Sequence, residues 1–254
     1  MRIAVCIKRV PITGGRVVLT EDGRAIDTRH LGFTMSPHEE CGVEEAVRLI
    51  EANRGDSVVI TLGPPEAVEQ LRDAMALGID RAIHLQTDGQ EWDGEGTAAA
   101  LTDAIRLEEA ASGPFDIIFF GNESADSGGF QVGARLARAI GRPCVTGLKK
   151  VALEGASVRC EQEVESGRDV YVVPLPAVLT VKEGLNLPRY PSVPGKMRAR
   201  SKPVAVVDSS RPAPGLELVR LTVPLGQGRR AESLGAGAAA APAVVELLRK
   251  AGIL

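Results

Sequence analysis

The sequence contains few aromatic residues and little net charge, and each shortage excludes a class of protein. Aromatic residues make up 3% of the 254 residues, and the formal net charge is −3. Proteins that bind nucleic acids need an excess of positive charge to meet the phosphates, and binders of single strands add aromatic side chains on which bases stack. We therefore expect no nucleic-acid partner.

Long apolar runs are also missing. A membrane-spanning helix needs ~20 consecutive apolar residues, and no segment of this sequence approaches that length. The first apolar run, residues 3–7, is interrupted by Lys8 and Arg9, so it fits neither a signal peptide nor an anchor. We expect no membrane insertion.

The cysteines are few and scattered. Cys6, Cys41, Cys144 and Cys160 form no CxxC pair, no haem-attachment motif and no zinc-ligand spacing. This usage is typical of a reduced, cytoplasmic protein without a metal site. Any redox chemistry would therefore depend on an organic cofactor.

The first 140 residues alternate between strand and helix signals. Short apolar runs predict buried strands at residues 3–10, 57–62, 82–85 and 116–120. Apolar residues at helical spacing predict helices from residue 36 to Gly55, at 67–78, 97–111 and 132–140. Ser36, Pro37 and Glu39 form a strong helix-start signal. The alternation predicts a parallel sheet covered by helices on both faces, a three-layer α/β fold.

The pattern changes after residue 149. A small hairpin is expected earlier, at residues 16–26, and further short strands are expected around Gly155 and Gly167. Another buried strand is expected at 175–181. Basic residues then alternate, and on an extended chain they would share one face: Lys196, Arg198, Arg200 and Lys202. That face is either simply solvated or steers an acidic partner.

The C-terminal tail has a composition of its own. Residues 235–241 are all glycine or alanine and predict a flexible linker. Residues 242–251 can form a helix with Val244, Leu247 and Leu248 on one face, but a helix of about ten residues is marginal alone. We therefore expect residues 1–234 to form an α/β body and residues 235–254 to form a docking arm.

A ligand is expected where the order of the strands reverses. If that order is 3-2-1-4, the loops at residues 11–15 and 121–131 face each other across a crevice. The second loop is glycine-rich and precedes a helix, a combination that can hold phosphate, although such loops can also simply turn the chain. Neither GxGxxG nor GxxxxGK[ST] is present.

Other polar residues carry weaker signals. His38 could touch a ligand, but we expect a solvated surface histidine, and we expect Cys6 to be a small core residue. His84 and Trp92 belong to no recognisable motif. No paired catalytic carboxylates and no Ser/His/Asp arrangement can be argued.

Several segments together resemble the beta subunit of electron-transfer flavoproteins. They are residues 3–11 (IAVCIKRVP), 35–37 (MSP), 43–49 (VEEAVRL), 62–64 (LGP), 76–82 (ALGIDRA), 175–181 (LPAVLTV) and 185–191 (LNLPRYP). The resemblance spans nearly the full length. It implies an adenine-nucleotide alpha-hydrolase-like fold and a heterodimer with an alpha subunit that holds most of the electron-carrying FAD. It also implies no bond-making active site in this chain. The beta crevice itself would bind AMP or, in bifurcating members, a second FAD.

The resemblance also assigns nucleotide-binding residues. The family's positions correspond to Cys6, Ser36, Pro37, His38, Glu39, Leu62, Gly121, Asn122, Glu123, Ser124, Ala125, Asp126, Ser127, Gly128, Gly129, Phe130, Gln131 and Val132. Asp126 matches the acidic residue that starts the family's phosphate turn, and residues 131–133 (QVG) resemble the bifurcating type. Two positions depart from the family: Phe130 offers no side-chain amide, and Thr13 stands where some members place an aromatic residue near the flavin.

A second assigned segment is the family's recognition loop, which docks on dehydrogenases and other redox partners such as quinone reductases. It corresponds to about residues 183–200, with Val193 at the apolar anchor position. The residues expected to dock are Leu185, Asn186, Pro188, Arg189, Tyr190, Val193 and Arg198. Proline-stiffened loops lose little entropy on binding.

Two alternatives remain beside the electron carrier. The same fold would permit a stand-alone adenine-nucleotide-binding module of the stress-protein type, since fold does not determine function. Residues 127–129 (SGG) also resemble an ATP-pyrophosphatase motif. That motif requires Asp and Ser where Gln131 and Val132 stand, and it follows the first strand, so this sequence fails both conditions.

Overall fold

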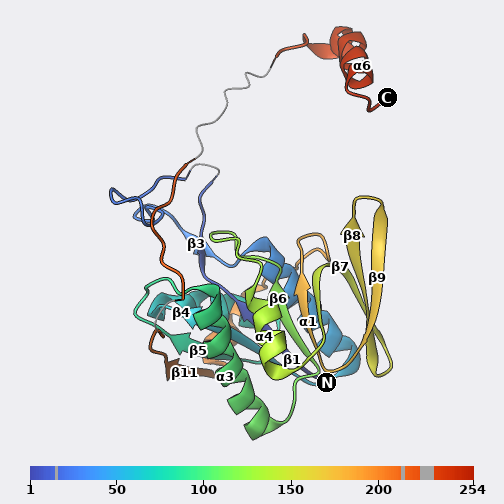
Figure 1. Cartoon of the computed structure of the whole chain (residues 1–254). Coiled ribbons are helices and arrows are strands. Elements are labelled where there is room, and N and C mark those ends of the chain that lie inside the picture. Colours follow the sequence, from blue (N-terminus) through green and yellow to red (C-terminus); the bar gives the residue numbers. More distant parts are fainter. Residues whose placement is uncertain (15–16, 213–214, 224–231) are drawn as a thin grey trace.

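The computed structural model describes residues 1–14, 17–212, 215–223 and 232–254. Its centre is a nine-stranded sheet (Figure 1) in the order β11 (Val204–Asp208), β5 (Arg81–Gln86), β4 (Asp56–Gly63), β1 (Arg2–Ile7), β6 (Ile117–Gly121), β10 (Ala177–Val181), β7 (Cys144–Glu154), β8 (Ser157–Val164) and β9 (Gly167–Pro174). The strands from β11 to β7 are parallel, whereas β8 and β9 extend the sheet in antiparallel fashion. The run β5-β4-β1-β6 confirms the predicted order 3-2-1-4.

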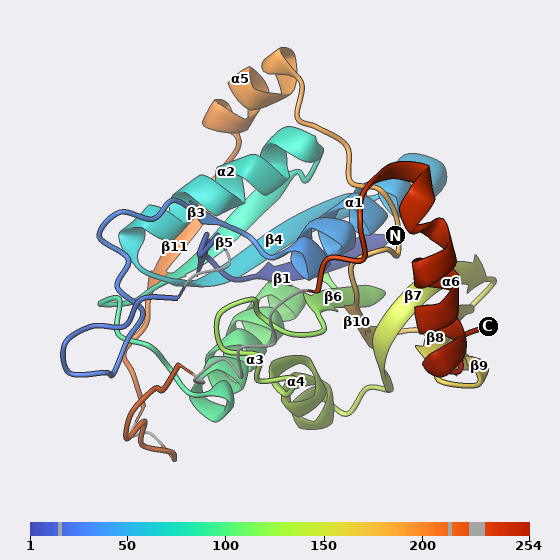
Figure 2. The ribbon, with the colours of Figure 1, turned by 90° about the horizontal axis from the view of Figure 1, so that it is seen from above.

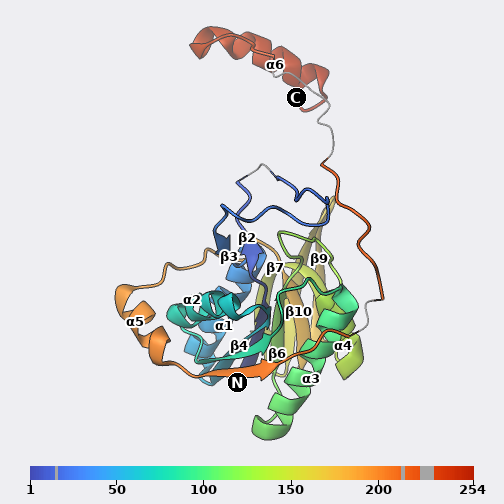
Figure 3. The same cartoon turned by 90° about the vertical axis from the view of Figure 1, so that its left-hand side faces the viewer.

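Helices cover both faces of this sheet. Figures 2 and 3 show α1 (Pro37–Asn53), α2 (Val68–Leu77) and α5 (Val193–Ser201) on one face, and α3 (Gly94–Ser112) and α4 (Val132–Ile140) on the other. Each face has its own apolar cluster, centred on Val5, Val43 and Leu179 on the first face and on Ala4, Ile105 and Leu136 on the second. Alternate residues of β1 thus enter opposite cores. The predicted three-layer α/β fold is confirmed.

Helix α1 begins where its start signal predicts. Pro37 occupies the first turn, and the carboxylate of Glu39 accepts a hydrogen bond of 3.1 Å from the Ser36 N–H. This bond belongs to a capping box, in which the Ser36 side chain also faces the Glu39 N–H, and the box fixes the direction in which the helix enters the fold. Because α1 follows β1, the capped first turn lies at the carboxyl-end edge of the sheet.

The extended basic segment is a wrong prediction. Residues 193–201 form the helix α5, whose N-cap Ser192 accepts a hydrogen bond of 3.1 Å from Gly195 N–H. In a helix, Lys196 and Arg200 share one face while Arg198 lies on another, so the four basic residues form no single stripe. Ser192 and Pro194 form a helix-start signal. This signal outweighs the spacing of basic residues at every second position.

Several smaller features refine the predictions. The strand β11 was not predicted. A two-stranded ribbon pairs β2 (Val10–Pro11) with β3 (Phe33–Thr34). Within the predicted hairpin, one antiparallel bridge joins Leu19 to Ile26, and Arg16 lies outside the described residues. The four cysteines are free.

The C-terminal helix forms as predicted. Its bounds are Ala241–Lys250 (α6), and the 3₁₀ turn η2 (Gly237–Ala240) leads into it, so part of the expected linker has regular structure. No residue of α6 is buried, and Val244, Val245 and Leu247 are exposed. The division at residue 234 stays a prediction. Among the described helices, none has the length and apolarity to cross a bilayer.

Candidate functional site

The carboxyl ends of β1 and β6 lie side by side at the point where strand order reverses. Strand β1 pairs with β4 on one side and with β6 on the other, and Cys6 of β1 lies opposite Phe120 of β6. Such a switch point leaves a crevice at the sheet edge in open α/β folds. The structure thus places the loop after β6 beside the first turn of α1.

Gly121 marks how closely these two segments approach. A Cβ atom at residue 121 would lie 2.8 Å from Glu39 Cγ and 3.3 Å from His38 Cβ. The first distance is shorter than van der Waals contact permits, so the chain needs glycine here. The predicted residues of α1 and of the loop are therefore brought together, as the fold argument expected.

An ion pair that spacing alone does not predict links the loops at the switch point. The ammonium of Lys8, just after β1, lies 2.8 Å from Asp126 Oδ2 and 2.6 Å from Glu91 Oε1. Burial alone would lower the pKa of Lys8, but the two carboxylates outweigh burial and raise it. Burial alone would raise the pKa of Asp126, but the ammonium of Lys8 outweighs burial and lowers it. Lys8 and Glu91 were missing from the predicted set.

Glu39 and Cys6 are both buried at the switch point. The Glu39 side chain is buried, and this desolvation raises its pKa to about 8, despite hydrogen bonds that favour the charged form. Burial therefore favours the protonated form of the Glu39 carboxyl, which can donate a hydrogen bond. Burial also raises the pKa of the Cys6 thiol, and the nearby charge of Glu39 raises it further. The thiol is therefore inert. The prediction of Cys6 as a core residue is confirmed.

One buried polar atom at the start of α1, His38 Nδ1, has no hydrogen-bond partner within the described part of the chain. The Ser36 side chain faces the Glu39 N–H in the capping box. The side chain of His38 is 19% exposed, and its Nε2 lies 3.9 Å from Glu123. The expectation of a solvated surface histidine is therefore wrong, because Gly121 brings the neighbouring loop against it. Unpaired buried polar atoms are costly and call for an explanation.

The loop between β6 and α4 is held by one hydrogen bond to β10 and by another within the loop. Asn122 N–H donates to the carbonyl of Val181 at 2.9 Å, and Gly128 N–H donates to the carbonyl of Ser124 at 3.0 Å. Phe130 has a φ of 54°, a left-handed conformation that side chains other than glycine rarely adopt. Strained backbone of this kind gathers at ligand sites.

The loop ends at the N-terminus of α4. No side chain caps that terminus, since the Oε1 atom of Gln131 accepts instead from Arg135 Nε at 2.7 Å. Leu62 completes the predicted set at the end of β4, where it packs against the cluster beneath α3 and α4. Uncapped N–H groups and the helix dipole favour an anion at this point.

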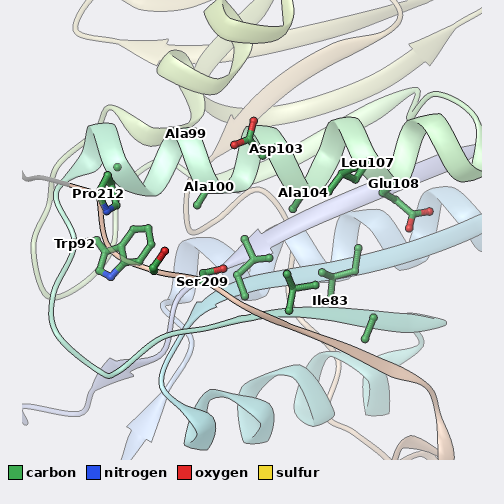
Figure 4. A pocket seen from close by; sticks show the side chains of 15 residues that line it. Ile83, Trp92, Ala99, Ala100, Asp103, Ala104, Leu107, Glu108, Ser209 and Pro212 are labelled. Atoms are coloured by element: carbon green, nitrogen blue, oxygen red, sulfur yellow. The ribbon is translucent and has the colours of Figure 1, made fainter.

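A groove of about 500 Å³ lies elsewhere, between α3 and the sheet edge at β5 and β11 (Figure 4). Its walls are largely apolar, including Trp92, Ala100, Leu107 and Val207, and its charged residues are Asp103 and Glu108. Acidic side chains repel phosphate, and no residue assigned to the nucleotide lines this groove. We therefore place the candidate nucleotide site at the switch point.

The predicted docking segment has a fixed part and an exposed part. Leu187, Tyr190 and Val193 are 84%, 96% and 74% exposed. In contrast, the side chains of Asn186 and Arg189 are engaged with α1, through Glu45 and Glu44 respectively. Sequence alone did not separate these two groups.

The fold defines a three-layer α/β protein with a mostly parallel sheet. Comparison with known proteins identifies the family. Residues 24–212 match the model of the electron transfer flavoprotein domain. The chain belongs to the electron transfer flavoprotein family, among relatives that are named as its beta subunit.

Three of these relatives illustrate the extent of the similarity, and each is named electron transfer flavoprotein subunit beta. The protein of Bacillus subtilis is 34% identical over 206 residues, which cover 80% of this chain and 77% of the relative. That of Mycobacterium tuberculosis (strain H37Rv) is 36% identical over 211 residues, covering 81% and 78%. That of Syntrophomonas wolfei is 33% identical over 225 residues, covering 88% and 86%. The resemblance inferred from short motifs is thereby confirmed.

Proposed function

We propose that this chain is the beta subunit of a heterodimeric electron-transfer flavoprotein. In this role it works with an alpha subunit that holds most of the FAD, and it carries electrons from flavoprotein dehydrogenases to further redox partners such as quinone reductases. The family match and the printed name of the relatives support the role. They also favour a subunit over a stand-alone nucleotide-binding module. The flavin supplies the redox chemistry when bound, and the protein positions it and tunes its surroundings.

We further propose that the crevice at the switch point binds an adenine nucleotide, either AMP or a second FAD. The observation that carries this proposal is the meeting of three features at one edge of the sheet. They are the strained turn at Phe130, the uncapped start of α4, and the buried unpaired Nδ1 atom of His38. The main-chain N–H groups before α4 would hold a phosphate, and the Nδ1 atom of His38 would meet a polar group of the nucleotide.

The carboxyl group of Glu39 adds a further possibility to this crevice. In its protonated form, which burial favours, it would face a nucleotide as a hydrogen-bond donor without repelling a phosphate. The loop carries two carboxylates: Lys8 neutralises Asp126, and Glu123 lies 3.9 Å from His38 Nε2. A phosphate before α4 would therefore be compatible with the paired Asp126, and Glu123 would have to point away from it.

The experiment is to express the chain together with its alpha subunit, purify the complex, and analyse the released small molecules by mass. Flavin absorbance between about 350 and 500 nm supports the carrier role, and a folded complex without it contradicts that role. One FAD with one AMP identifies the simple type, and two FADs identify the bifurcating type. A complex without any nucleotide beyond the shared FAD contradicts the proposed crevice.

The stand-alone alternative has its own test. Isothermal titration of the isolated chain with ATP would show tight binding if the chain works without a partner. We expect weak or no binding, because the chain is proposed to complete its sites in the heterodimer. The cytoplasmic location stays a prediction.

A further inference from the structure

The two ring nitrogens of His38 have different surroundings. The Nδ1 atom is buried and has no hydrogen-bond partner among the described residues, whereas the Nε2 atom lies 3.9 Å from Glu123 Oε1. That distance is within reach of an ion pair but is too long for a hydrogen bond. The imidazole therefore lies beside one carboxylate and leaves its other nitrogen unused.

The Glu123 carboxylate lies between this imidazole and the glycine turn of the loop. While its Oε1 atom faces His38, a Cβ atom at Gly128 would lie 3.6 Å from its Oε2 atom. Gly121 holds the two sides together, because a Cβ atom there would lie 3.3 Å from His38 Cβ. A phosphate held by the glycine turn would thus have Glu123 as a neighbour, with His38 behind it.

A neutral imidazole cannot satisfy both of its sides when a nucleotide is present. In the neutral form one ring nitrogen donates a hydrogen bond and the other only accepts, whereas in the protonated form both nitrogens donate. Glu123 requires a donor at Nε2, and an acceptor oxygen of a nucleotide would require a donor at Nδ1. The protonated ring meets both requirements at once, and an imidazole can gain or lose this proton near neutral pH.

The charged groups of the neighbouring loops are mostly negative. The ammonium of Lys8 is shared by Asp126 at 2.8 Å and Glu91 at 2.6 Å, so one cation already faces two carboxylates. Glu123 adds a third carboxylate. A phosphate that enters here would meet an excess of negative charge, which the dipole of α4 offsets only in part.

The other titratable groups near His38 belong to β1, α1 and α4. Burial raises the pKa of Glu39 to about 8 and also raises the pKa of Cys6, so it favours the uncharged form of each. Arg135, in the first turn of α4, is engaged with Glu95 of α3 at 3.6 Å. A proton on His38 would therefore add a cation where its neighbours are uncharged or already paired.

We propose that His38 takes up a proton when a nucleotide occupies the crevice, so that nucleotide binding is linked to pH. The proton comes from the solvent and binds to the free ring nitrogen, and no other covalent bond forms or breaks. The imidazolium then donates from Nε2 to Glu123, which it draws away from the phosphate, and from Nδ1 to an oxygen of the nucleotide. The inference rests on the proposed function for the identity of the ligand. Because the bound form holds more protons than the free form, affinity falls as the pH rises.

The first test measures the proton uptake directly. AMP and, separately, FAD are titrated calorimetrically into the heterodimer from which the crevice nucleotide has been removed, in buffers that differ in their enthalpy of ionisation. The heat of binding then varies with the buffer in proportion to the protons taken up. We expect about 0.5–1 proton per bound nucleotide at about pH 7.5. FAD is the cleaner probe, because a phosphate monoester such as AMP itself titrates near pH ~6. Binding heats that do not depend on the buffer overturn the inference.

The second test assigns the proton to its residue. His38→Asn removes the titratable ring but keeps a neutral amide donor, so we expect it to bind nucleotide without proton uptake. Its affinity should change less than about twofold between about pH 6.5 and 8.5, whereas that of the wild type should fall about tenfold. Glu39→Gln should retain the uptake, and His30→Asn is the matched control because that histidine is exposed. Uptake that persists in His38→Asn overturns the assignment.

A further variant and the pattern of failure complete the test. Glu123→Gln removes the carboxylate that pairs with the imidazolium, and it should lower the proton uptake about twofold. Uptake equal to that of the wild type overturns the role of Glu123, even if His38→Asn does not fold. A folded heterodimer that binds neither AMP nor FAD in the crevice overturns the proposed nucleotide site and this inference together. Binding without proton uptake overturns this inference alone.

Discussion

Lys8 and Asp126 lie 2.8 Å apart, and they join the end of β1 to the loop after β6 across the switch point of the sheet. The two residues are 118 positions apart in the chain, so only the folded sheet brings them together. Glu91 shares the same ammonium at 2.6 Å. One cation thus holds two loops that border the proposed nucleotide site.

Replacing Lys8 with Met is expected to lower the free energy of unfolding by about 1–3 kcal/mol, because two carboxylates then face each other without a cation in a partly buried place. Thermal and urea unfolding of the complex would measure the change. Lys150→Met is the control, since its partner Glu161 keeps two other cations and the Lys150 side chain is exposed. We expect little change there. An equal loss in both variants would contradict a special role for Lys8.

Stability is expected to fall as the pH rises from 4.5 to 8, because of Glu39. The pKa of Glu39 is raised to about 8 by burial, against 4.5 ordinarily, so folding takes up a proton between these values. The stabilisation that Glu39 contributes is complete below pH 4.5 and is lost as the pH rises through 8. The free energy of unfolding then changes by at most about 1.4 kcal/mol per pH unit. Unfolding measured at several pH values should show a flatter profile in Glu39→Gln. The exposed Glu66→Gln should keep the wild-type slope.

Gly121→Ala is expected to destabilise the protein by about 1–3 kcal/mol, because its new methyl group would overlap Glu39 and press on His38. Gly129→Ala is a matched substitution in the same loop, where the nearest atom would lie 3.8 Å away and the backbone needs no left-handed conformation. Its melting temperature should stay close to that of the wild type. If both variants unfold alike, the close approach at Gly121 is not the cause.

Removing residues 235–254 is expected to weaken association with the alpha subunit without unfolding the α/β body. Val244, Val245 and Leu247 of α6 are exposed, and a free ten-residue helix is marginal in water. Leu247→Asp in the full chain should reproduce the loss, about tenfold or more in affinity, if this apolar face is the contact. Analytical ultracentrifugation with the alpha subunit would measure it. Unchanged affinity in both variants would exclude a docking arm.

The fold was largely predictable because its strands and helices are separated by clear turn signals. Runs such as residues 57–62 read as buried strands, and the strand order then followed from the alternation. The helix α5 was missed because the period-two spacing of basic residues resembles a strand, whereas Ser192 and Pro194 start a helix. The strand β11 is only five residues long, and nothing in its spacing indicates which edge it joins.

The candidate site was predictable to the extent that it follows from the strand order. The loop after β6 had to meet the first turn of α1 once β1 and β6 were neighbours, and Gly121 confirms that meeting. The partners of Lys8 could not be predicted, because Glu91 lies on a loop whose path depends on side-chain packing. For the same reason, only the structure separates the inward Arg189 from the outward Tyr190.

The position of β11 has a practical consequence for handling the chain. It is the last strand on its side of the described sheet, and it pairs with β5 alone, while Val206 and Val207 are exposed. A bare strand edge with apolar side chains is a template on which other molecules can add strands. Overproduction of this subunit by itself should therefore yield aggregates, and placing a lysine at residue 206 should improve recovery.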